Sequence, residues 1–253
     1  MADKALETVF LNGEFLPKDE AKVSAFDRGF IFGDGIYEVV PVINSKMVDK
    51  EGFWARFERS LNEIDISLPY EKEKFEAILN DMIAKNALKE GGIYMQVTRG
   101  VAFRNFYFME NLTPSVFIFC YESEILNNQA AKTGIKVVSV EDIRWKRRDI
   151  KSISLLAQCY AKNEAHKKGA DEGFMVENGF VTEGCSSSAF IIKDKTLITK
   201  PLSNEILPGI RRMRLLRIAK DIGLKIEERK FSMDEVYSCL LYTSDAADDL
   251  LCV

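Results

Sequence analysis

The 253-residue sequence contains a single histidine, His166, in a polar stretch predicted to be helical. A Ser/His/Asp hydrolase needs a histidine as its general base, and a multi-histidine metal site needs several as ligands. The composition therefore favours neither class of protein, and no metal site is predicted.

Cysteines are few and scattered. There are five, an odd number, and no Cys-x-x-Cys spacing occurs among Cys120, Cys159, Cys185, Cys239 and Cys252. A disulfide framework or a zinc site requires paired and more closely spaced cysteines. We therefore expect reduced thiols and a cytoplasmic location.

The chain also lacks a basic excess and a long apolar run. Lys and Arg total 35 against 39 Asp and Glu, for a formal net charge of −4, while 47% of the residues are hydrophobic. Nucleic acids attract an excess of positive charge, and a membrane helix needs about 20 consecutive apolar residues. The composition predicts a soluble enzyme with a sizeable core, no nucleic-acid partner and no membrane segment.

Turn signals and apolar periodicity predict alternating strands and helices. Asn12-Gly13 and Asn178-Gly179 each lie between apolar runs and predict β-hairpins. Apolar residues recur every three or four positions over 52–65 and 75–83, as is typical of amphipathic helices. Further strands are expected over 93–97, 116–121 and 135–140, and further helices over 154–168 and after Pro208.

These patterns predict a mixed α/β (α+β) fold of two domains. The expected N-terminal α+β domain covers residues 1–121, and the C-terminal domain covers 134–238. The polar segment 122–133 is expected to be the interdomain linker.

Lys151 and Glu183 form the chemically most informative pair. Lys151 lies in an expected loop before a helix, and Glu183 ends the second strand of the second hairpin. A lysine amine can hold the aldehyde of pyridoxal phosphate as a Schiff base, and a carboxylate can keep the pyridine nitrogen of that cofactor protonated. Either residue alone is most simply interpreted as a surface charge. Their shared sequence context favours cofactor chemistry.

That context is a set of five blocks that resembles the class IV (fold type IV) pyridoxal-phosphate-dependent aminotransferases, and most closely their D-amino acid transaminase branch. The order and spacing of the blocks carry the resemblance, which implies a two-domain enzyme of fold type IV with a cofactor-binding C-terminal domain. It also implies a homodimer, because the family completes its cleft with residues of a neighbouring subunit. The blocks are Phe26–Glu38, Gln96–Gly100, Glu141–Trp145 leading to Lys151, Thr182–Ser188 and Ile206–Arg211.

The resemblance implies roles for individual residues. Lys151 is the expected catalytic residue, which holds the cofactor and moves the proton, and Glu183 is the expected partner of the ring nitrogen. The other residues expected to bind the cofactor are Arg56, Leu207, Ile210, Arg211, Ser186, Ser187, Arg144 and Tyr37. Those expected to bind the substrate are Tyr37, Phe30, Arg104 and Phe106.

Plainer interpretations stay open for several of these residues. Arg56 also fits a solvated helix face, and Tyr37 also fits a core position. The segment from Gly184 to Ser187 also fits an ordinary polar turn.

Two segments depart from the family pattern. Where the family has an Arg-x-His pair that binds the substrate carboxylate, this chain has Arg104-Asn105-Phe106. An apolar partner favours hydrophobic or aromatic donors, or amines without a carboxylate, unless the ring only packs. Residues 239–253 do not resemble the family and are expected to be a non-native tail, which would leave the C-terminal domain incomplete.

The predicted function is transamination with pyridoxal 5'-phosphate. The amino donor would be a D-amino acid or a hydrophobic or aromatic amine, and the acceptor a 2-keto acid such as pyruvate or 2-oxoglutarate. A branched-chain L-amino acid transaminase or an aminodeoxychorismate lyase would share the lysine and the glutamate, so both stay open. A cofactor-binding remnant with little turnover, suggested by the altered tail, is a further alternative.

Overall fold

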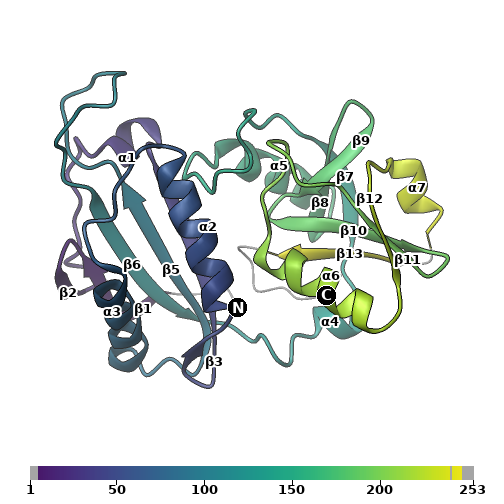
Figure 1. Cartoon of the computed structure of the whole chain (residues 1–253), viewed down its shortest axis with the longest axis horizontal. Coiled ribbons are helices and arrows are strands. Elements are labelled where there is room, and N and C mark those ends of the chain that lie inside the picture. Colours follow the sequence, from purple (N-terminus) through teal and green to yellow (C-terminus); the bar gives the residue numbers. More distant parts are fainter. Residues whose placement is uncertain (1–4, 240, 247–253) are drawn as a thin grey trace. The chain divides into compact units, whose positions relative to one another are not determined.

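The computed structural model describes residues 5–239 and 241–246 and consists of two compact units (Figure 1). The first unit comprises Met1–Ile125 and Ile150–Ser154, and the second comprises Leu126–Asp149 and Leu155–Val253. The segment that carries Lys151 belongs to the first unit because its backbone hydrogen-bonds to a strand of that unit. The sequence assigned this segment to the C-terminal domain, and the expected domain bounds stay a prediction.

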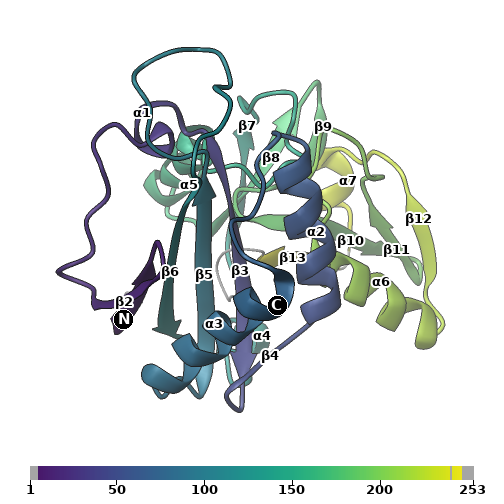
Figure 2. The same cartoon turned by 60° about the vertical axis from the view of Figure 1, so that its left-hand side comes forward.

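The first unit is built on a six-stranded antiparallel sheet in the order β2-β1-β6-β5-β3-β4. Helices α2 and α3 pack against this sheet (Figures 1 and 2). The strands are β1 (Ala5–Leu11), β2 (Glu14–Pro17), β3 (Gly35–Ile43), β4 (Lys46–Met47), β5 (Glu90–Thr98) and β6 (Ser115–Glu122), and the helices are α1 (Arg28–Phe32), α2 (Lys50–Asn62) and α3 (Lys72–Lys85).

Local signals explain the elements of this unit. Asn12 and Gly13 adopt positive φ angles of 50° and 108°, which a two-residue hairpin turn requires, and β1 and β2 pair on either side of them. The predicted amphipathic helices are confirmed as α2 and α3, whose buried faces include Phe57 and Phe75. The rings of these two residues stack with centroids 5.6 Å apart. Burial of these large rings against the sheet contributes to the stability of the unit.

The second unit contains a three-stranded sheet in the order β7-β8-β9 and a four-stranded sheet in the order β12-β11-β10-β13. The hairpin predicted around Asn178-Gly179 is confirmed as β8 and β9. The strands are β7 (Val137–Glu141), β8 (Glu172–Glu177), β9 (Phe180–Gly184), β10 (Ser187–Lys193), β11 (Thr196–Thr199), β12 (Lys225–Glu228) and β13 (Leu241–Ala246). The helices are α4 (Ala130–Thr133), α5 (Leu156–Lys167), α6 (Ile210–Asp221) and α7 (Met233–Tyr237).

A shared apolar core joins the hairpin of the second unit to its larger sheet. Phe174 and Val181 from the hairpin pack with Ile191, Ile198 and Phe231, and all five are fully or almost fully buried. This core fixes the strand ends of β9 and β10. Glu183 and the serine-rich turn lie at those ends.

Part of the expected non-native tail is a strand. β13 pairs antiparallel with β10, from Ser187 opposite Ala246 to Ile192 opposite Leu241. Residue 240 and residues 247–253, which complete the expected tail, lie outside the described residues. Within the described ranges, no helix is both long and apolar enough to cross a membrane.

Candidate active site

Lys151 is 2% exposed and lies beside strand β3. Its carbonyl accepts a hydrogen bond from the Tyr37 amide at 2.9 Å, and its own amide donates to Ser60 Oγ at 3.3 Å. Its Nζ lies 4.1 Å from the centroid of the Tyr37 ring. Burying an ammonium group is costly, so a buried lysine with an aromatic neighbour is a candidate for chemistry.

Tyr37 is itself buried and extends from β3. Its ring stacks on Tyr94 with centroids 5.6 Å apart, and the Tyr94 hydroxyl donates to Gln96 Oε1 at 2.9 Å. The stack limits the rotation of Tyr37 and thereby fixes the wall against which the Lys151 amine lies. The Tyr37 ring is thus both a packed residue and a direct neighbour of the candidate catalytic amine.

Arg56 lies on the buried side of α2, so the solvated-face interpretation is wrong. Its Nε and Nη2 donate to the two carboxylate oxygens of Glu38 at 2.7 and 2.8 Å. Glu38 is fully buried on β3, and this two-bond contact fixes the plane of the guanidinium. The first unit therefore contains a buried cationic group held in one orientation.

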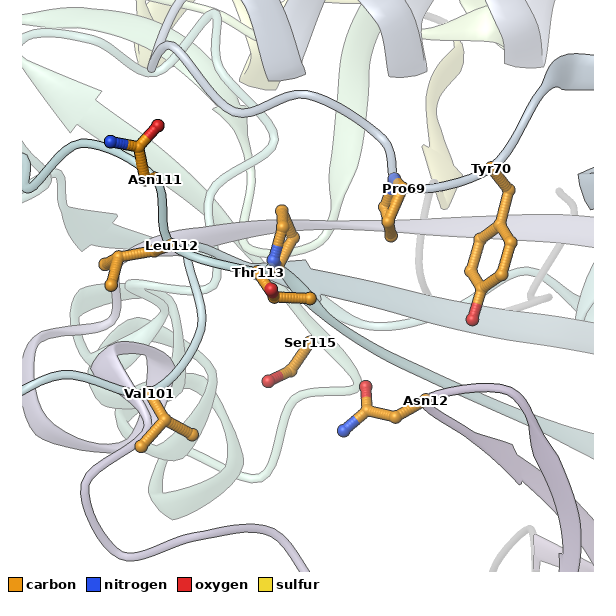
Figure 3. Close-up of a pocket in the computed structure, with 9 residues that line it drawn as sticks. Asn12, Pro69, Tyr70, Val101, Asn111, Leu112, Thr113 and Ser115 are labelled. Carbon is orange, nitrogen blue, oxygen red and sulfur yellow. The ribbon is translucent and has the colours of Figure 1, made fainter.

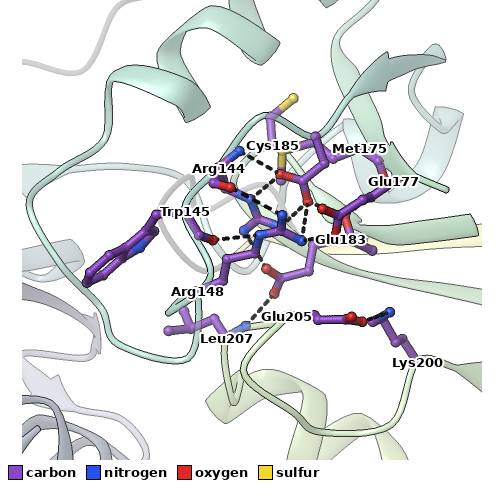
Figure 4. A network of polar contacts seen from close by, with 12 residues as sticks. Arg144, Trp145, Arg148, Met175, Glu177, Glu183, Cys185, Lys200, Glu205 and Leu207 are labelled. Atoms are coloured by element: carbon purple, nitrogen blue, oxygen red, sulfur yellow. Dashed lines mark hydrogen bonds and ion pairs between the residues drawn. The ribbon is translucent and has the colours of Figure 1, made fainter.

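In the second unit, Glu183 ends β9 and is buried in a network of charges (Figure 4). Arg144 Nη1 donates to Glu183 Oε2 at 2.6 Å, and the Leu207 amide donates to Glu183 Oε1 at 2.9 Å. Arg144 also contacts Asp142 through two side-chain nitrogens, at 3.0 and 2.7 Å. Both oxygens of Glu183 are therefore fixed in position.

The pKa values in this network follow from burial and pairing. Burial raises the pKa of Glu183, while Arg144 and the Leu207 amide act in the opposite direction. Burial would lower the pKa of Arg144, but Glu183 and Asp142 more than offset this and raise it. Burial would likewise raise the pKa of Asp142, but the hydrogen bond and charge of Arg144 lower it. Arg144 therefore carries its positive charge beside both carboxylates.

Glu172 holds the turn that follows Glu183. Its Oε1 accepts hydrogen bonds from the Gly173 and Cys185 amides, and its Oε2 accepts from Ser186 Oγ and Ser187 Oγ, both at 3.3 Å. The segment is therefore more than an ordinary polar turn, because a buried carboxylate orders it. The two serine hydroxyls expected to bind the cofactor are engaged by Glu172 in this structure.

Besides the Glu183 network and the serine turn, the second unit carries expected site residues at the start of α6. The helix begins at Ile210 and Arg211 after Gly209, which provides no side-chain cap. A Cβ at Gly209 would lie 2.7 Å from Ser188 Oγ, so this hydroxyl would have to move to admit a side chain. A helix N-terminus beside a serine-rich turn is suited to bind an anion such as a phosphate. Ile206 is buried next to it, and Leu207 is half-buried.

Apart from the buried Tyr37, the expected substrate-binding side chains are exposed on the first unit. Phe30 and Phe106 are 76% and 75% exposed, and Arg104 is exposed in the loop that joins β5 to β6. The Arg104 guanidinium lies 4.9 Å from the centroid of the Phe106 ring. These residues form a cationic and aromatic surface that a carboxylate or an aromatic donor could contact.

The structure thus divides the expected residues into two groups. Lys151, Tyr37 and Arg56 belong to the first unit, where they lie on or beside β3 and α2, together with the exposed loop residues. Glu183 and Arg144 meet in the second unit, which also carries the serine turn and the start of α6. The described residues contain no cluster of His, Cys, Asp and Glu that could hold a metal ion.

One cavity of the first unit measures about 490 Å³ and is lined by none of the expected site residues (Figure 3). Its walls come from the β1–β2 turn, the segment between α2 and α3, the start of β6 and both ends of the β5–β6 loop. The lining residues are Asn12, Pro69, Tyr70, Val101, Asn111, Leu112, Thr113, Pro114 and Ser115.

Sequence reasoning missed Glu38 and Asp142. Glu38 was visible as a charge within the apolar strand Gly35–Ile43, and a buried charge in such a run needs a partner. Asp142 stands two residues before Arg144, a spacing that allows the contact seen here. Neither partner could be assigned without the three-dimensional pairing.

Comparisons with known proteins identify the family. The family model described as amino-transferase class IV matches residues 35–245. The D-alanine aminotransferase of Staphylococcus aureus (strain N315) is 41% identical over 229 residues, which cover 90% of this chain and 81% of that protein. The D-alanine aminotransferase of Bacillus licheniformis is 33% identical over 242 residues, which cover 95% and 85%.

A solved structure shows the same fold. It is the branched-chain amino acid aminotransferase from Escherichia coli, which matches with a TM-score of 0.85 at 20% identity. The match covers 96% of this chain and 82% of that one. The predicted fold class is confirmed. The chain is an aminotransferase of fold type IV and belongs to the class IV aminotransferase family.

Proposed function

We propose that this aminotransferase uses pyridoxal 5'-phosphate and transfers the amino group of a D-amino acid, or of a hydrophobic or aromatic amine, to a 2-keto acid such as pyruvate or 2-oxoglutarate. The observation that carries the proposal is the burial of Lys151 against Tyr37. A buried amine on a chain of this family has a chemical reason to be there, whereas burial alone would cost stability.

The chemistry of the residues within each unit supports this cofactor. On the first unit, Arg56 would bind its phosphate. On the second unit, the amides of Ile210 and Arg211 would do so, together with the Ser186 and Ser187 hydroxyls once these turn away from Glu172. Leu207, Arg144 and Tyr37 would line its ring. The glycine at 209, where a Cβ would approach Ser188 Oγ to 2.7 Å, leaves the backbone open for such an anion. Pyridoxal phosphate, when bound, supplies an aldehyde for amines and a ring that accepts electrons.

The protein residues then have distinct tasks. Lys151 would anchor the cofactor through Nζ and, as a free amine, would move the proton from the donor carbon to the cofactor carbon. Glu183, fixed by Arg144 and the Leu207 amide, would present a carboxylate to the positively charged ring nitrogen. Tyr37 would restrict the path of the Lys151 amine.

The substrate proposal rests on Arg104 and Phe106. A guanidinium suits a carboxylate, and the adjacent ring suits an apolar side chain or an aryl amine. The relatives named as D-alanine aminotransferases support a D-amino acid donor. A branched-chain L-amino acid transaminase and an aminodeoxychorismate lyase stay alternatives on the same scaffold, and a remnant that binds cofactor with little turnover is a third.

We further propose a cytoplasmic homodimer. The described cysteines Cys120, Cys159, Cys185 and Cys239 are free thiols, as expected for a reducing compartment. Exposed rings on the first unit, among them Phe103 and Tyr107, support association with a second copy.

Replacement of Lys151 by alanine tests the function. We expect Lys151→Ala to lower turnover of D-alanine with 2-oxoglutarate by at least about a hundredfold, because both the anchor and the proton-transferring base are lost. The visible absorbance of added pyridoxal phosphate on the protein should change as well. Lys200→Ala is the matched control, since Lys200 is also buried but pairs with Glu205 in the second unit.

The proposal fails if Lys151→Ala keeps both the absorbance and the turnover of the wild type. A panel of D-amino acids, L-amino acids and aryl amines, tested on the wild type, separates the proposed donors from the alternatives. A protein that shows the absorbance but no half-reaction with any donor would be the cofactor-binding remnant.

A further inference from the structure

The loop of residues 101–114 joins β5 to β6 and carries Arg104 and Phe106 on the surface. Exposed loops are usually mobile, and a mobile arginine binds a carboxylate less well than a fixed one. The contacts that fix this loop therefore bear on substrate recognition.

A buried charge cluster lies beneath the loop. Asp34 Oδ2 accepts hydrogen bonds from Arg28 Nε at 2.6 Å and from Arg99 Nε at 2.9 Å. The three side chains are at most 8% exposed. Arg99 also donates to the Ile64 and Asp65 carbonyls, which ties the cluster to the segment after α2. Asp34 thus holds two arginines in fixed orientations.

Arg28 extends from this cluster to the loop. Its Nη1 donates to the Asn105 carbonyl at 2.6 Å, so it holds the backbone between Arg104 and Phe106. Its own amide donates to the Gly100 carbonyl at 2.9 Å, at the start of the loop. One arginine therefore contacts the segment at two points.

The Phe32 ring lies close to Arg28 and to both loop side chains, Arg104 and Phe106. Its centroid lies 4.7 Å from the Arg28 guanidinium, 5.7 Å from that of Arg104 and 5.6 Å from the Phe106 ring. The buried arginine and the two exposed side chains therefore share one aromatic neighbour. Movement of Arg28 or Phe32 would change the position of both loop side chains.

We propose that Arg28, oriented by Asp34 and packed on Phe32, is a positioning residue that sets substrate affinity by fixing Arg104. This inference rests on the proposed role of Arg104 as the group that binds the substrate carboxylate. Arg28 acts through the Asn105 carbonyl and has no contact with substrate in this scheme. A lysine at position 28 keeps the positive charge beside Asp34. It lacks the planar guanidinium whose separate nitrogens donate to Asp34 and to the Asn105 carbonyl.

The test is a double-mutant cycle on the full-length enzyme supplied with pyridoxal phosphate. KM and kcat for D-alanine, with L-leucine as a second donor, are measured for the wild type, Arg28→Lys, Arg104→Gln and the double variant. We expect Arg28→Lys to raise the donor KM by about tenfold to a hundredfold while kcat and cofactor absorbance stay unchanged. In the Arg104→Gln background the same change should have no further effect on KM.

Arg59→Lys, at a half-buried arginine on α2 in the same unit, is the matched control and should leave KM unchanged. Phe32→Leu provides a second variant should Arg28→Lys fail to fold, and it should raise KM in the same direction. If Arg104→Gln leaves KM unchanged for both donors, the proposed role of Arg104 is wrong. The positioning role is overturned if Arg104→Gln raises KM but the Arg28 and Phe32 variants do not. It is also overturned if the KM increase caused by the Arg28 or Phe32 variant adds fully to the increase caused by Arg104→Gln.

Discussion

Two arginines of the second unit, Arg144 and Arg148, each contact two carboxylates. Arg144 lies between Asp142 and Glu183, and Arg148 Nη1 contacts Glu177 at 2.8 Å and Asp142 at 3.2 Å. Removal of one partner from such a network leaves a buried charge uncompensated, which costs more than the pair contributes. The position of Glu183 therefore depends, through Arg144, on Asp142 and its contact with Arg148, neither of which is an expected site residue.

Glu177 makes this network sensitive to acid. The hydrogen bond from Arg148, followed by that from Lys146, lowers the pKa of Glu177 from 4.5 to about 2. A carboxyl group whose pKa falls on folding contributes stability above its unfolded pKa and loses that contribution as the pH drops toward the folded value. The relevant window is between 4.5 and about 2.

We therefore expect the Glu177→Gln variant to be less stable than the wild type near neutral pH, with a difference that shrinks below pH 4.5. Urea unfolding of both proteins at a series of pH values measures the difference in free energy of unfolding. Glu110→Gln, which removes one exposed carboxylate from the first unit, is the control. A stability difference that is constant over the whole series would contradict the role assigned to Glu177.

Individual residues show what the sequence could predict about the site. Lys151 and Glu183 could be identified from the order and spacing of the family blocks along the chain. Each is buried within its own unit, as a functional group would be. Their assignments stay predictions. The pairing of Arg56 with Glu38 could not be foreseen, because a helix and a strand 18 positions apart meet only after the sheet has formed. Long-range pairs leave no periodic signal in one sequence.

At the scale of elements, local chemistry predicted the hairpins and amphipathic helices. Asn-Gly turns and recurring aromatic residues act within a few positions, so β1–β2, β8–β9, α2 and α3 could be placed from the sequence. Strands β10 and β11 were not assigned, because their apolar runs are short and largely buried and so lack a clear alternation. The pairing of β10 with β13 involves the segment Leu241–Ala246, most of which the family match includes, and its expected non-native origin stays a prediction.

Strand β13 covers an edge of β10, and removal of it tests the importance of the tail. Without residues 241–246 the outer N–H and C=O groups of β10 would lose their backbone partners. We expect deletion of residues 241–253 to lower the free energy of unfolding by about 1–3 kcal/mol. The backbone hydrogen bonds lost contribute about 0.5–1.5 kcal/mol each, and the conformational entropy of the ordered strand offsets most of their sum. Replacement of Tyr242 and Ser244 by proline, which removes backbone donors, is the matching substitution.

Urea denaturation of the wild type, the deletion variant and the proline variant measures the change in the free energy of unfolding. A deletion that costs nothing would mean that β10 does not need the strand, as expected of a foreign tail. Cofactor titration of the same proteins reports independently on whether the segment affects the phosphate site.

At the scale of the whole molecule, the exposed rings of the first unit predict self-association. Phe30, Phe103, Phe106, Tyr107 and Phe108 are each more than half exposed, and they belong to α1 and the β5–β6 loop. Exposed aromatic clusters of this kind usually mark an interface, and buried aromatic anchors dominate the energy of such contacts. The loop that carries Arg104 is thus expected to lie at the contact between two copies.

Introduction of negative charge on this surface should dissociate the proposed dimer. We expect Phe103→Glu combined with Tyr107→Glu to raise the dimer dissociation constant by at least about a hundredfold, because two anchors are lost and like charges face one another across a two-fold contact. Sedimentation velocity over a range of protein concentrations measures the constant. Ile222→Glu, on an equally exposed residue after α6, should leave it unchanged. A wild type that stays monomeric at every concentration, or a double variant that still dimerises, would show that these rings serve another purpose.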